Sequence, residues 1–196
     1  MIGEMSRQKQ EYRKQLKEQY ELLDPAYVLK AGQAIAETVI SLPVFQHASS
    51  VFVYLSTPRE PDTAAIIKAA FAAGKSVYVP KCEGQVMKAV RIHPDSVMKA
   101  GRLGIMEPQD DSVTAGDRID LSIIPCMSVT PEGCRLGHGM GYYDRFLKET
   151  ETCRLCLCFD EMMSDRLPFD SRDEPMDLVA SEAGVISVSA AARQPG

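Results

Sequence analysis

The stretch VFVYLSTPREPDTAAIIKAAFAAGKSVYVP, residues 51–80, decides the fold, because it places two strand patterns on either side of one helix pattern. The apolar runs VFVYL (51–55) and SVYVP (76–80) are typical of short buried strands. Between them, DTAAIIKAAFAAG (62–74) has the composition of a helix that ends at Gly74. A strand, a helix and a second strand with short connections predict a parallel pair of strands with a right-handed crossover.

Similar elements continue on both sides of this unit. Two helices are expected before it: one capped by Ser6 that runs through Tyr20, and one that starts at Asp24-Pro25 and ends at Leu42-Pro43. The remaining patterns predict a helix at 142–150, strands at 86–92, 120–125, 154–159 and 185–188, and a Gly- and Pro-rich loop at 101–117. Strands that alternate with helices predict an α/β fold, here a single three-layer domain over residues 1–188 with a mainly parallel sheet. Residues 189–196 are expected to form a flexible tail.

The composition is that of an ordinary globular protein. Of the 196 residues, 45% are hydrophobic and 25% are charged, and the formal net charge is −5. A negative charge does not favour a nucleic-acid-binding role. No apolar run is long enough to span a membrane, and the charged N-terminus MIGEMSRQKQEYRKQLKEQ lacks the apolar centre of a secretory signal. We therefore expect a cytoplasmic protein that binds neither nucleic acid nor membrane.

The six cysteines leave two interpretations open. The segment CRLCLCFD (153–160) contains C-x-x-C and C-x-C spacings that would suit a metal or redox site. The same segment alternates like a buried strand, and no second Cys/His pair stands at zinc-finger spacing. Because free cysteines are common in protein cores, the core interpretation is favoured.

Two loops follow expected strands, where the ligands of parallel α/β sheets bind: STPREPDT (56–63) and SVTPEGCRLGHGMGY (128–142). The second loop has alternating glycines directly before a helix start, which brings backbone N–H groups and the positive end of a helix dipole to an anion. Arg135 adds a guanidinium, and Asp144 is placed to bind a Mg²⁺ ion that bridges phosphates. Neither a Walker A loop nor a Rossmann fingerprint is present, since Tyr142 stands where the latter needs glycine. The loop predicts a site for the phosphates of a nucleoside triphosphate, with a tight structural turn as the alternative.

The run GCRLGHGMGYYDRFL (133–147) resembles the signature of the 5-formyltetrahydrofolate cyclo-ligase family, roughly G-x-R-L-G-x-G-x-G-Y-Y-D. Other blocks resemble this family in the same order: Lys9 and Arg13 in the first helix, EPDT at 60–63, YVPK before Met87, GIMEP at 104–108, DLSIIP at 120–125 and LPFDSRDEPMD at 167–177. The resemblance covers roughly residues 6–186. The chain departs from the family's pattern at Cys126, Met140, Met162 and Arg172, which concern the folate pocket more than the ATP site. A related ligase with an altered substrate is therefore an alternative.

The resemblance implies both a fold and a reaction. The fold would be the architecture shared by sugar-phosphate isomerases and CoA transferases. The reaction would be the ATP- and Mg²⁺-dependent closure of 5-formyltetrahydrofolate to 5,10-methenyltetrahydrofolate, with release of ADP and phosphate, through phosphorylation of the formyl oxygen. The implied partners are a reduced folate and ATP, bound by a monomer or a weak homodimer.

The resemblance also implies roles for individual residues. ATP would contact Lys9, Arg13, Arg135, Leu136, Gly137, His138, Gly139, Met140, Gly141, Tyr142 and Tyr143. The folate would contact Leu55, Glu60, Gly139, Met140, Gly141 and Tyr142, and the Glu60 carboxylate would accept hydrogen bonds from pterin N–H groups. Asp144 and Asp173 would bind Mg²⁺. Without the resemblance, Lys9 and Arg13 would be interpreted as the solvated face of a charged helix, and Glu60 as an exposed loop acid.

Other functions are alternatives to this interpretation. A non-catalytic folate- or nucleotide-binding protein has no need of the full set Lys9, Arg13, Arg135, Asp144 and Asp173. A phosphosugar enzyme or regulator on a similar scaffold would not require the complete signature run. A metal sensor that uses the cysteines is the third alternative. We further expect Arg135 to lie on an exposed loop and Asp144 at a surface helix start, so that replacing either would cost little stability.

Overall fold

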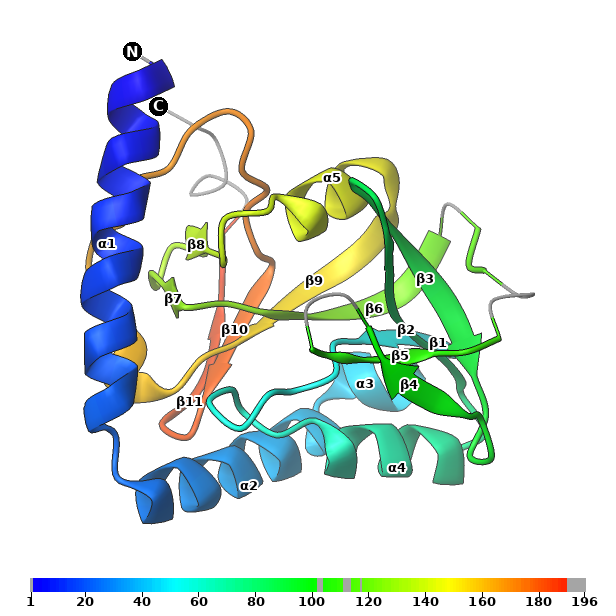
Figure 1. Cartoon of the computed structure of the whole chain (residues 1–196). Coiled ribbons are helices and arrows are strands. Elements are labelled where there is room, and N and C mark those ends of the chain that lie inside the picture. Colours follow the sequence, from blue (N-terminus) through cyan, green and yellow to red (C-terminus); the bar gives the residue numbers. More distant parts are fainter. Residues whose placement is uncertain (1, 102–103, 111–113, 117, 190–196) are drawn as a thin grey trace.

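The computed structural model describes residues 2–101, 104–110, 114–116 and 118–189 (Figure 1). Its main sheet is built from β1 (Ser50–Val53), β2 (Ser76–Glu83), β3 (Val86–Ile92), β6 (Arg118–Pro125), β9 (Glu151–Leu157), β10 (Leu178–Ser181) and β11 (Gly184–Ser187). The order across this sheet is β11-β10-β9-β6-β1-β2-β3. Neighbouring strands from β10 to β2 are parallel, and the edge strands β3 and β11 are antiparallel to their neighbours. The predicted α/β fold with a mainly parallel sheet is confirmed.

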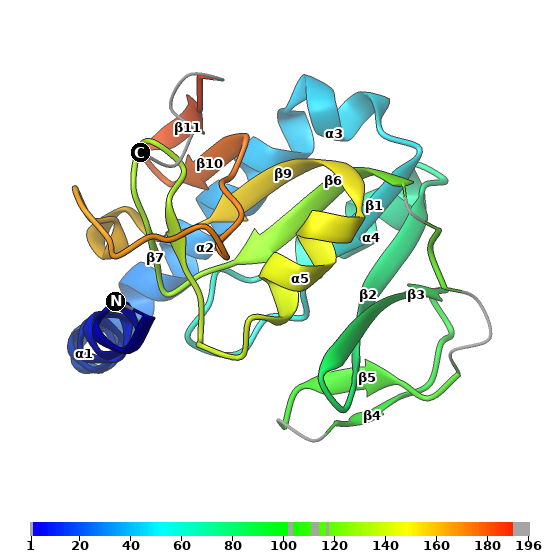
Figure 2. The same cartoon turned by 90° about the horizontal axis from the view of Figure 1, so that it is seen from above.

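The helices form layers on the two faces of the sheet. They are α1 (Ile2–Leu22), α2 (Pro25–Ser41), α3 (Pro43–His47), α4 (Ala64–Ala72) and α5 (Tyr142–Glu149), with a 3₁₀ turn η1 (Asp160–Met162). Figures 1 and 2 show α2 and α4 on one face of the sheet and α5 on the other. Helix α1 stands at one side of these layers and contacts η1. This position brings the first helix next to the loops that leave the sheet.

Helix α2 shows how the local sequence sets the elements. The side chain of Asp24 accepts a hydrogen bond from the Ala26 N–H (2.9 Å), and Pro25 occupies the first turn, where its missing N–H costs nothing. After α4, Gly74 has a φ of +70°, which closes the helix as its sequence predicts. The prediction that Ser6 caps the first helix is wrong, because α1 begins at Ile2 and Ser6 lies within it.

Short pairs of strands also occur where the sequence predicted loop or gave no signal. Strands β4 (Met98–Ala100) and β5 (Met106–Pro108) form a two-stranded sheet, so the predicted loop 101–117 is only partly irregular. Strands β7 (Ser128–Val129) and β8 (Arg135–Leu136) pair within the glycine-rich loop. Pairs this short lack a periodic signal and depend on their tertiary surroundings.

One connected hydrophobic cluster fills the space between the layers. Its members reach from Leu16 on α1 to Val188, and include Phe52 on β1, Ile123 on β6 and Leu155 on β9. Cys126, Cys156 and Cys158 are buried in it, as the favoured interpretation predicts. In the described part of the chain, no helix is long and apolar enough to cross a membrane. The predicted tail lies outside the described residues from residue 190 onward.

Candidate functional site

A cavity of about 930 Å³ lies at the edge of the sheet where β1 and β6 end. Because these neighbouring strands are parallel, the loops that follow them, 56–63 and 126–141, leave the sheet at the same edge. Both loops line the cavity, together with α1 and the start of α5. Every residue predicted to bind ATP, folate or Mg²⁺ lines this one cavity. The structure therefore brings together residues that lie far apart in the sequence.

The glycines of the loop are required by arginine side chains as well as by backbone angles. Gly139 and Gly141 have φ values of +104° and +64°, which other residues rarely adopt. A Cβ atom at Gly139 would lie 3.2 Å from Cζ of Arg13, and one at Gly137 would lie 2.6 Å from Nη1 of Arg135. The loop therefore lies between two guanidinium groups, and a side chain at Gly137 or Gly139 would displace one of them.

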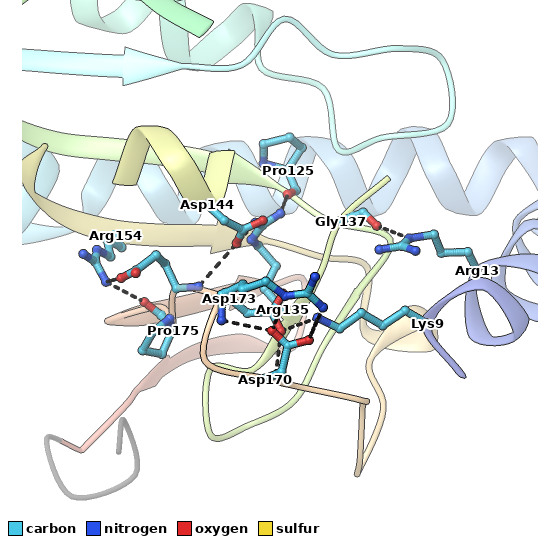
Figure 3. Close-up of polar contacts among 12 residues, drawn as sticks. Lys9, Arg13, Pro125, Arg135, Gly137, Asp144, Arg154, Asp170, Asp173 and Pro175 are labelled. Atoms are coloured by element: carbon cyan, nitrogen blue, oxygen red, sulfur yellow. Dashed lines mark hydrogen bonds and ion pairs between the residues drawn. The ribbon is translucent and has the colours of Figure 1, made fainter. Parts of the chain in front are cut away.

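Arg135 is buried, which corrects the prediction that it lies on an exposed loop. Only 4% of its surface is exposed, and its Nη2 forms an ion pair with Oδ1 of Asp144 at 2.7 Å (Figure 3). Its Nη1 donates to the Pro125 carbonyl at 3.3 Å. Burial lowers the pKa of the Arg135 guanidinium. The charge of the neighbouring Asp144 carboxylate and its hydrogen bond raise that pKa, and the net shift is upward. Nε is buried and has no hydrogen-bond partner among the described residues. The expectation of a small stability effect is withdrawn for Arg135 and, since the two are paired, for Asp144.

Helix α1 contributes the second basic group of the cavity. Lys9 is only 7% exposed, so it does not belong to a solvated face. Its Nζ contacts Oδ2 of Asp173 at 2.5 Å and Oδ2 of Asp170 at 3.0 Å (Figure 3). One turn later, Nε of Arg13 donates to the Gly137 carbonyl at 2.7 Å. Lys9 and Arg13 thus fasten α1 to the two loops that carry the predicted site residues.

Arg154 on β9 fixes the loop that carries Asp173. Arg154 donates through Nη1 to the Glu174 carboxylate (2.9 Å) and to the Pro175 carbonyl (3.3 Å) (Figure 3). The Glu174 N–H in turn donates to Oδ1 of Asp144 at 3.3 Å. These contacts place the backbone that follows Asp173 against the side chain of Asp144, so the two predicted metal ligands lie in the same region of the cavity.

The pair Asp144 and Asp173 fits a hard cation that carries ligands of its own. Hydrogen bonds within the described residues use Oδ1 of Asp144 and Oδ2 of Asp173, which leaves one oxygen of each carboxylate for a further ligand. Mg²⁺ prefers such oxygens and commonly combines one or two carboxylates with phosphate and water. No group of three or more acidic, His or Cys side chains that could hold a metal occurs among the described residues. A cation bound by these two carboxylates would take its remaining oxygen ligands from a bound anion and from water.

Apolar side chains line another part of the cavity. Leu55 and Met87 line it, and Glu60 lies there with only 10% of its side chain exposed. Oε2 of Glu60 accepts a hydrogen bond from the Thr57 N–H at 2.8 Å, and Oε1 lies 3.9 Å from Nε2 of His138. Glu60 is therefore a fixed acceptor in the wall of the cavity, not an exposed loop acid.

Tyrosines close the floor of the cavity. Tyr54 is fully buried and donates through its hydroxyl to the Pro61 carbonyl (2.6 Å), and burial raises its pKa well above the usual value. Tyr143 packs edge to face on Phe52, with ring centroids 6.4 Å apart, and burial raises its pKa too. Tyr142 instead reaches the turn between β2 and β3, where it donates to the Gly84 carbonyl at 2.7 Å. The two consecutive tyrosines therefore serve different walls.

Sequence reasoning missed several residues of this cavity. Tyr54, Cys82, Glu107, Arg145 and Arg172 also line it. Arg172 stands out in the sequence only as a departure from the family's pattern, and Arg145 comes directly after Asp144, the last fixed position of the signature. Cys82 and Glu107 come from the β2 and β5 strands, and their approach (Cys82 N–H to Glu107 Oε1, 3.2 Å) depends on tertiary contacts that no local pattern encodes.

The parallel sheet and the basic, glycine-rich cavity at its carboxyl edge define a class: an α/β protein with the features of a binding site for an anionic small molecule. Comparison with known proteins is more specific. The sequence model of the 5-formyltetrahydrofolate cyclo-ligase family matches residues 5–182, and the chain belongs to this family.

Individual relatives agree with this membership. The chain is 31% identical over 172 residues to the 5-formyltetrahydrofolate cyclo-ligase of Escherichia coli, an alignment that covers 83% of this chain and 94% of that one. The structure is similar to that of the 5,10-methenyltetrahydrofolate synthetase of Aquifex aeolicus, with a TM-score of 0.83, 28% identity and 92% of each chain covered. A synthetase of the same name from Mycoplasma pneumoniae shares the fold, with a TM-score of 0.71 at 18% identity over 89% of this chain and 98% of that one.

Proposed function

We propose that this protein catalyses the ATP- and Mg²⁺-dependent conversion of 5-formyltetrahydrofolate to 5,10-methenyltetrahydrofolate. The observation that carries the proposal is the single cavity that contains all the predicted ATP, folate and metal residues, in a chain that belongs to the cyclo-ligase family. A cavity of about 930 Å³ lies at the upper end of the roughly 300–1,000 Å³ that is typical of ligand pockets.

The reaction needs activation because an amide oxygen is a poor leaving group. The formyl oxygen attacks the γ-phosphorus of ATP, the bond from that phosphorus to the bridging oxygen breaks, and ADP leaves. The N10 amine then attacks the formyl carbon, loses its proton, and the phosphorylated oxygen departs as inorganic phosphate with its electron pair. The carbon ends as the methenyl bridge between N5 and N10. Catalysis of this kind consists mainly of positioning the reactants and neutralising charge.

The basic end of the cavity suits the triphosphate. Lys9 and Arg13 come from α1, and the ion pair with Asp144 fixes the position of the Arg135 guanidinium. The glycine loop supplies backbone that an anion can approach closely. In this proposal these groups bind and align the β- and γ-phosphates, with Leu136 to Tyr143 along the nucleotide.

The folate would occupy the apolar end. There Leu55 packs on the pterin, Glu60 accepts from its N–H groups, and Gly139 to Tyr142 contact both substrates. Asp144 and Asp173 would hold Mg²⁺ together with phosphate oxygens, and the ion would neutralise the charge of the transferred group. The two carboxylates now pair with Arg135 and Lys9, so they are already oriented toward the phosphate end.

Direct assay tests this proposal. Purified protein mixed with MgATP and 5-formyltetrahydrofolate should produce methenyl absorbance and ADP in a one-to-one ratio. Omission of either ATP or Mg²⁺ should abolish both signals. Tight binding of both ligands without turnover would instead identify a non-catalytic binding protein, and ATP hydrolysis without methenyl formation would point to a different acceptor.

A further inference from the structure

Strands β2 and β3 extend past the sheet as a two-stranded arm, residues 79–90. Strand β1 pairs with β2 only over Ser76–Tyr78, whereas β2 and β3 remain paired as far as Glu83 and Val86. The arm ends in a two-residue turn, Gly84–Gln85, whose glycine has a φ of +62°. The base of the arm is fixed by the core, where Val79, Ala89 and Val90 are buried. Because a two-stranded ribbon alone is only marginally stable in water, contacts nearer the turn decide where the tip lies.

One such contact comes from the β4–β5 pair. The Cys82 N–H donates to Oε1 of Glu107 at 3.2 Å. This bond supports the middle of the arm from the side of β5 but does not reach the turn. The tip reaches α5 instead (Figure 1).

Two residues in the first turn of α5 hold the tip. The Tyr142 hydroxyl donates to the Gly84 carbonyl at 2.7 Å. Nη2 of Arg145 donates both to the Gln85 carbonyl (2.8 Å) and to the Met140 carbonyl (3.1 Å). The same guanidinium lies 5.3 Å over the Tyr142 ring. Arg145 therefore connects the tip of the arm, the glycine loop and the Tyr142 side chain through one rigid group.

The glycine loop is shaped around this guanidinium. A Cβ atom at Gly141 would lie 2.9 Å from Nη1 of Arg145, so the loop passes directly over the arginine. Pro80, Cys82 and Met87 line the cavity from the arm, and Gly139 to Gly141 line it from the loop. The contacts of Arg145 thus fix the separation between two walls of the same cavity.

We propose that Arg145 is a positioning residue that sets the width of the folate end of the cavity, and so determines affinity for the fused ring of the folate much more than affinity for ATP. The inference rests on the proposed function, in which the triphosphate lies against Lys9, Arg13 and Arg135 and the glycine loop contacts both substrates. The arm, in contrast, has no assigned contact with the nucleotide. Only an arginine supplies a planar fork that can donate to two carbonyls while it stacks on an aromatic ring. A lysine at this position keeps the charge but loses the bridge.

Three variants separate this role from a general effect on the fold. Arg145→Met removes the donors and keeps most of the apolar stem, and Arg145→Lys keeps only the charge. Arg118→Met is the matched control, because Arg118 is exposed and lies at the start of β6, at the end of the strand opposite to the cavity-lining Pro125. Equilibrium dialysis gives the Kd of 5-formyltetrahydrofolate and of ATP for each protein without any need for turnover.

Loss of about one to two hydrogen bonds predicts that Arg145→Met raises the folate Kd, and the folate KM, by about tenfold. The Kd of ATP should change by less than about twofold, with an intermediate folate effect for Arg145→Lys and none for Arg118→Met. An unchanged folate Kd, or equal losses for both ligands, would overturn the inference.

Hydrogen exchange provides a readout that is independent of the reaction. In the ligand-free Arg145→Met protein, the amides of residues 83–87 should exchange at least about tenfold faster than in the wild type, while those of β9 stay unchanged. Unchanged exchange at 83–87 would show that Arg145 does not hold the arm and would refute the inference. A wild-type protein that binds folate through this arm but has no cyclo-ligase activity would refute the proposed function alone.

Discussion

The guanidinium of Arg135 and the carboxylate of Asp144 form a buried ion pair, with Nη2 and Oδ1 2.7 Å apart, at the base of the glycine loop. This pair links strand β8 to helix α5 across the loop that lies between them. The same oxygen accepts from the Glu174 N–H at 3.3 Å, so the carboxylate also holds the loop that carries Asp173. If Asp144 both pairs with Arg135 and organises the reaction, its replacement should affect stability and turnover separately.

Asp144→Asn should therefore lose both stability and turnover. The amide can still accept from Arg135, but the buried guanidinium loses its counter-charge, so we expect unfolding to become easier by about 2 kcal/mol. Turnover should fall at least about 100-fold, because the charge that organises phosphoryl transfer is gone. Urea unfolding and methenyl formation measure the two effects. Partial recovery of turnover at high Mg²⁺ supports the metal role, whereas near wild-type turnover would exclude it.

Arg135→Met should be more costly to stability than Arg135→Lys. Methionine removes the partners of Asp144 and of the Pro125 carbonyl, and breaking a buried pair in this way costs about 3–5 kcal/mol. Arg135→Lys keeps the charge, so its loss in free energy of unfolding should be about half that of Arg135→Met. Urea midpoints at constant slope measure the difference. Equal midpoints for the wild type and the methionine variant would contradict the importance of the pair.

Lys9→Met should weaken ATP binding, and it should also cost stability because Asp170 and Asp173 lose a buried partner. Loss of a buried positive charge that contacts phosphate should raise the Kd of ATP at least about 30-fold. The control is Lys14→Met, on the exposed part of the same helix, where no change is expected. Calorimetric titration with a non-hydrolysable ATP analogue measures both. A similar Kd in the two variants would remove Lys9 from the nucleotide site.

Stability at acid pH should depend on Asp170. Hydrogen bonds from Arg172, helped by Lys9, hold the pKa of the Asp170 carboxyl well below its usual range. A lowered pKa in the folded state contributes stability that is complete above the unfolded value of about 3.9 and is lost as the pH falls below it. Asp170→Asn should thus destabilise the protein by a constant amount between about pH 5 and 7 and by less at pH 3. Asp165→Asn, at an exposed position, is the control. A difference between wild type and Asp170→Asn that stays the same at pH 3 would refute this account.

The sequence was sufficient to predict the parts of the site that lie in continuous motifs. The glycine loop, its arginine and the following aspartate are neighbours in the chain, and the β1–α4–β2 unit has local signals for each element. The predicted residues from α1 and from the loop at 173 depended on resemblance to the family, since no local pattern links Lys9 to Asp173.

Burial and long-range contacts could not be predicted in the same way. The burial of Arg135 depends on its contacts with Pro125 and Asp144, and no local sequence pattern reveals these contacts. The bond from Tyr142 to Gly84 joins residues 58 positions apart, and the predicted strands 76–80 and 86–92 do not show that β2 and β3 continue together to this contact. The short strands β5 and β8 likewise exist because of their neighbours, not because of their own composition.

The fate of the formyl oxygen tests the central claim most directly. Protein, MgATP and 5-formyltetrahydrofolate labelled with ¹⁸O in the formyl group should give methenyl product and inorganic phosphate, and mass spectrometry of the phosphate follows the label. If the formyl oxygen is phosphorylated and then leaves with the phosphate, each phosphate carries a single ¹⁸O atom. Unlabelled phosphate, with the ¹⁸O in water or still in the folate, would contradict the proposed reaction.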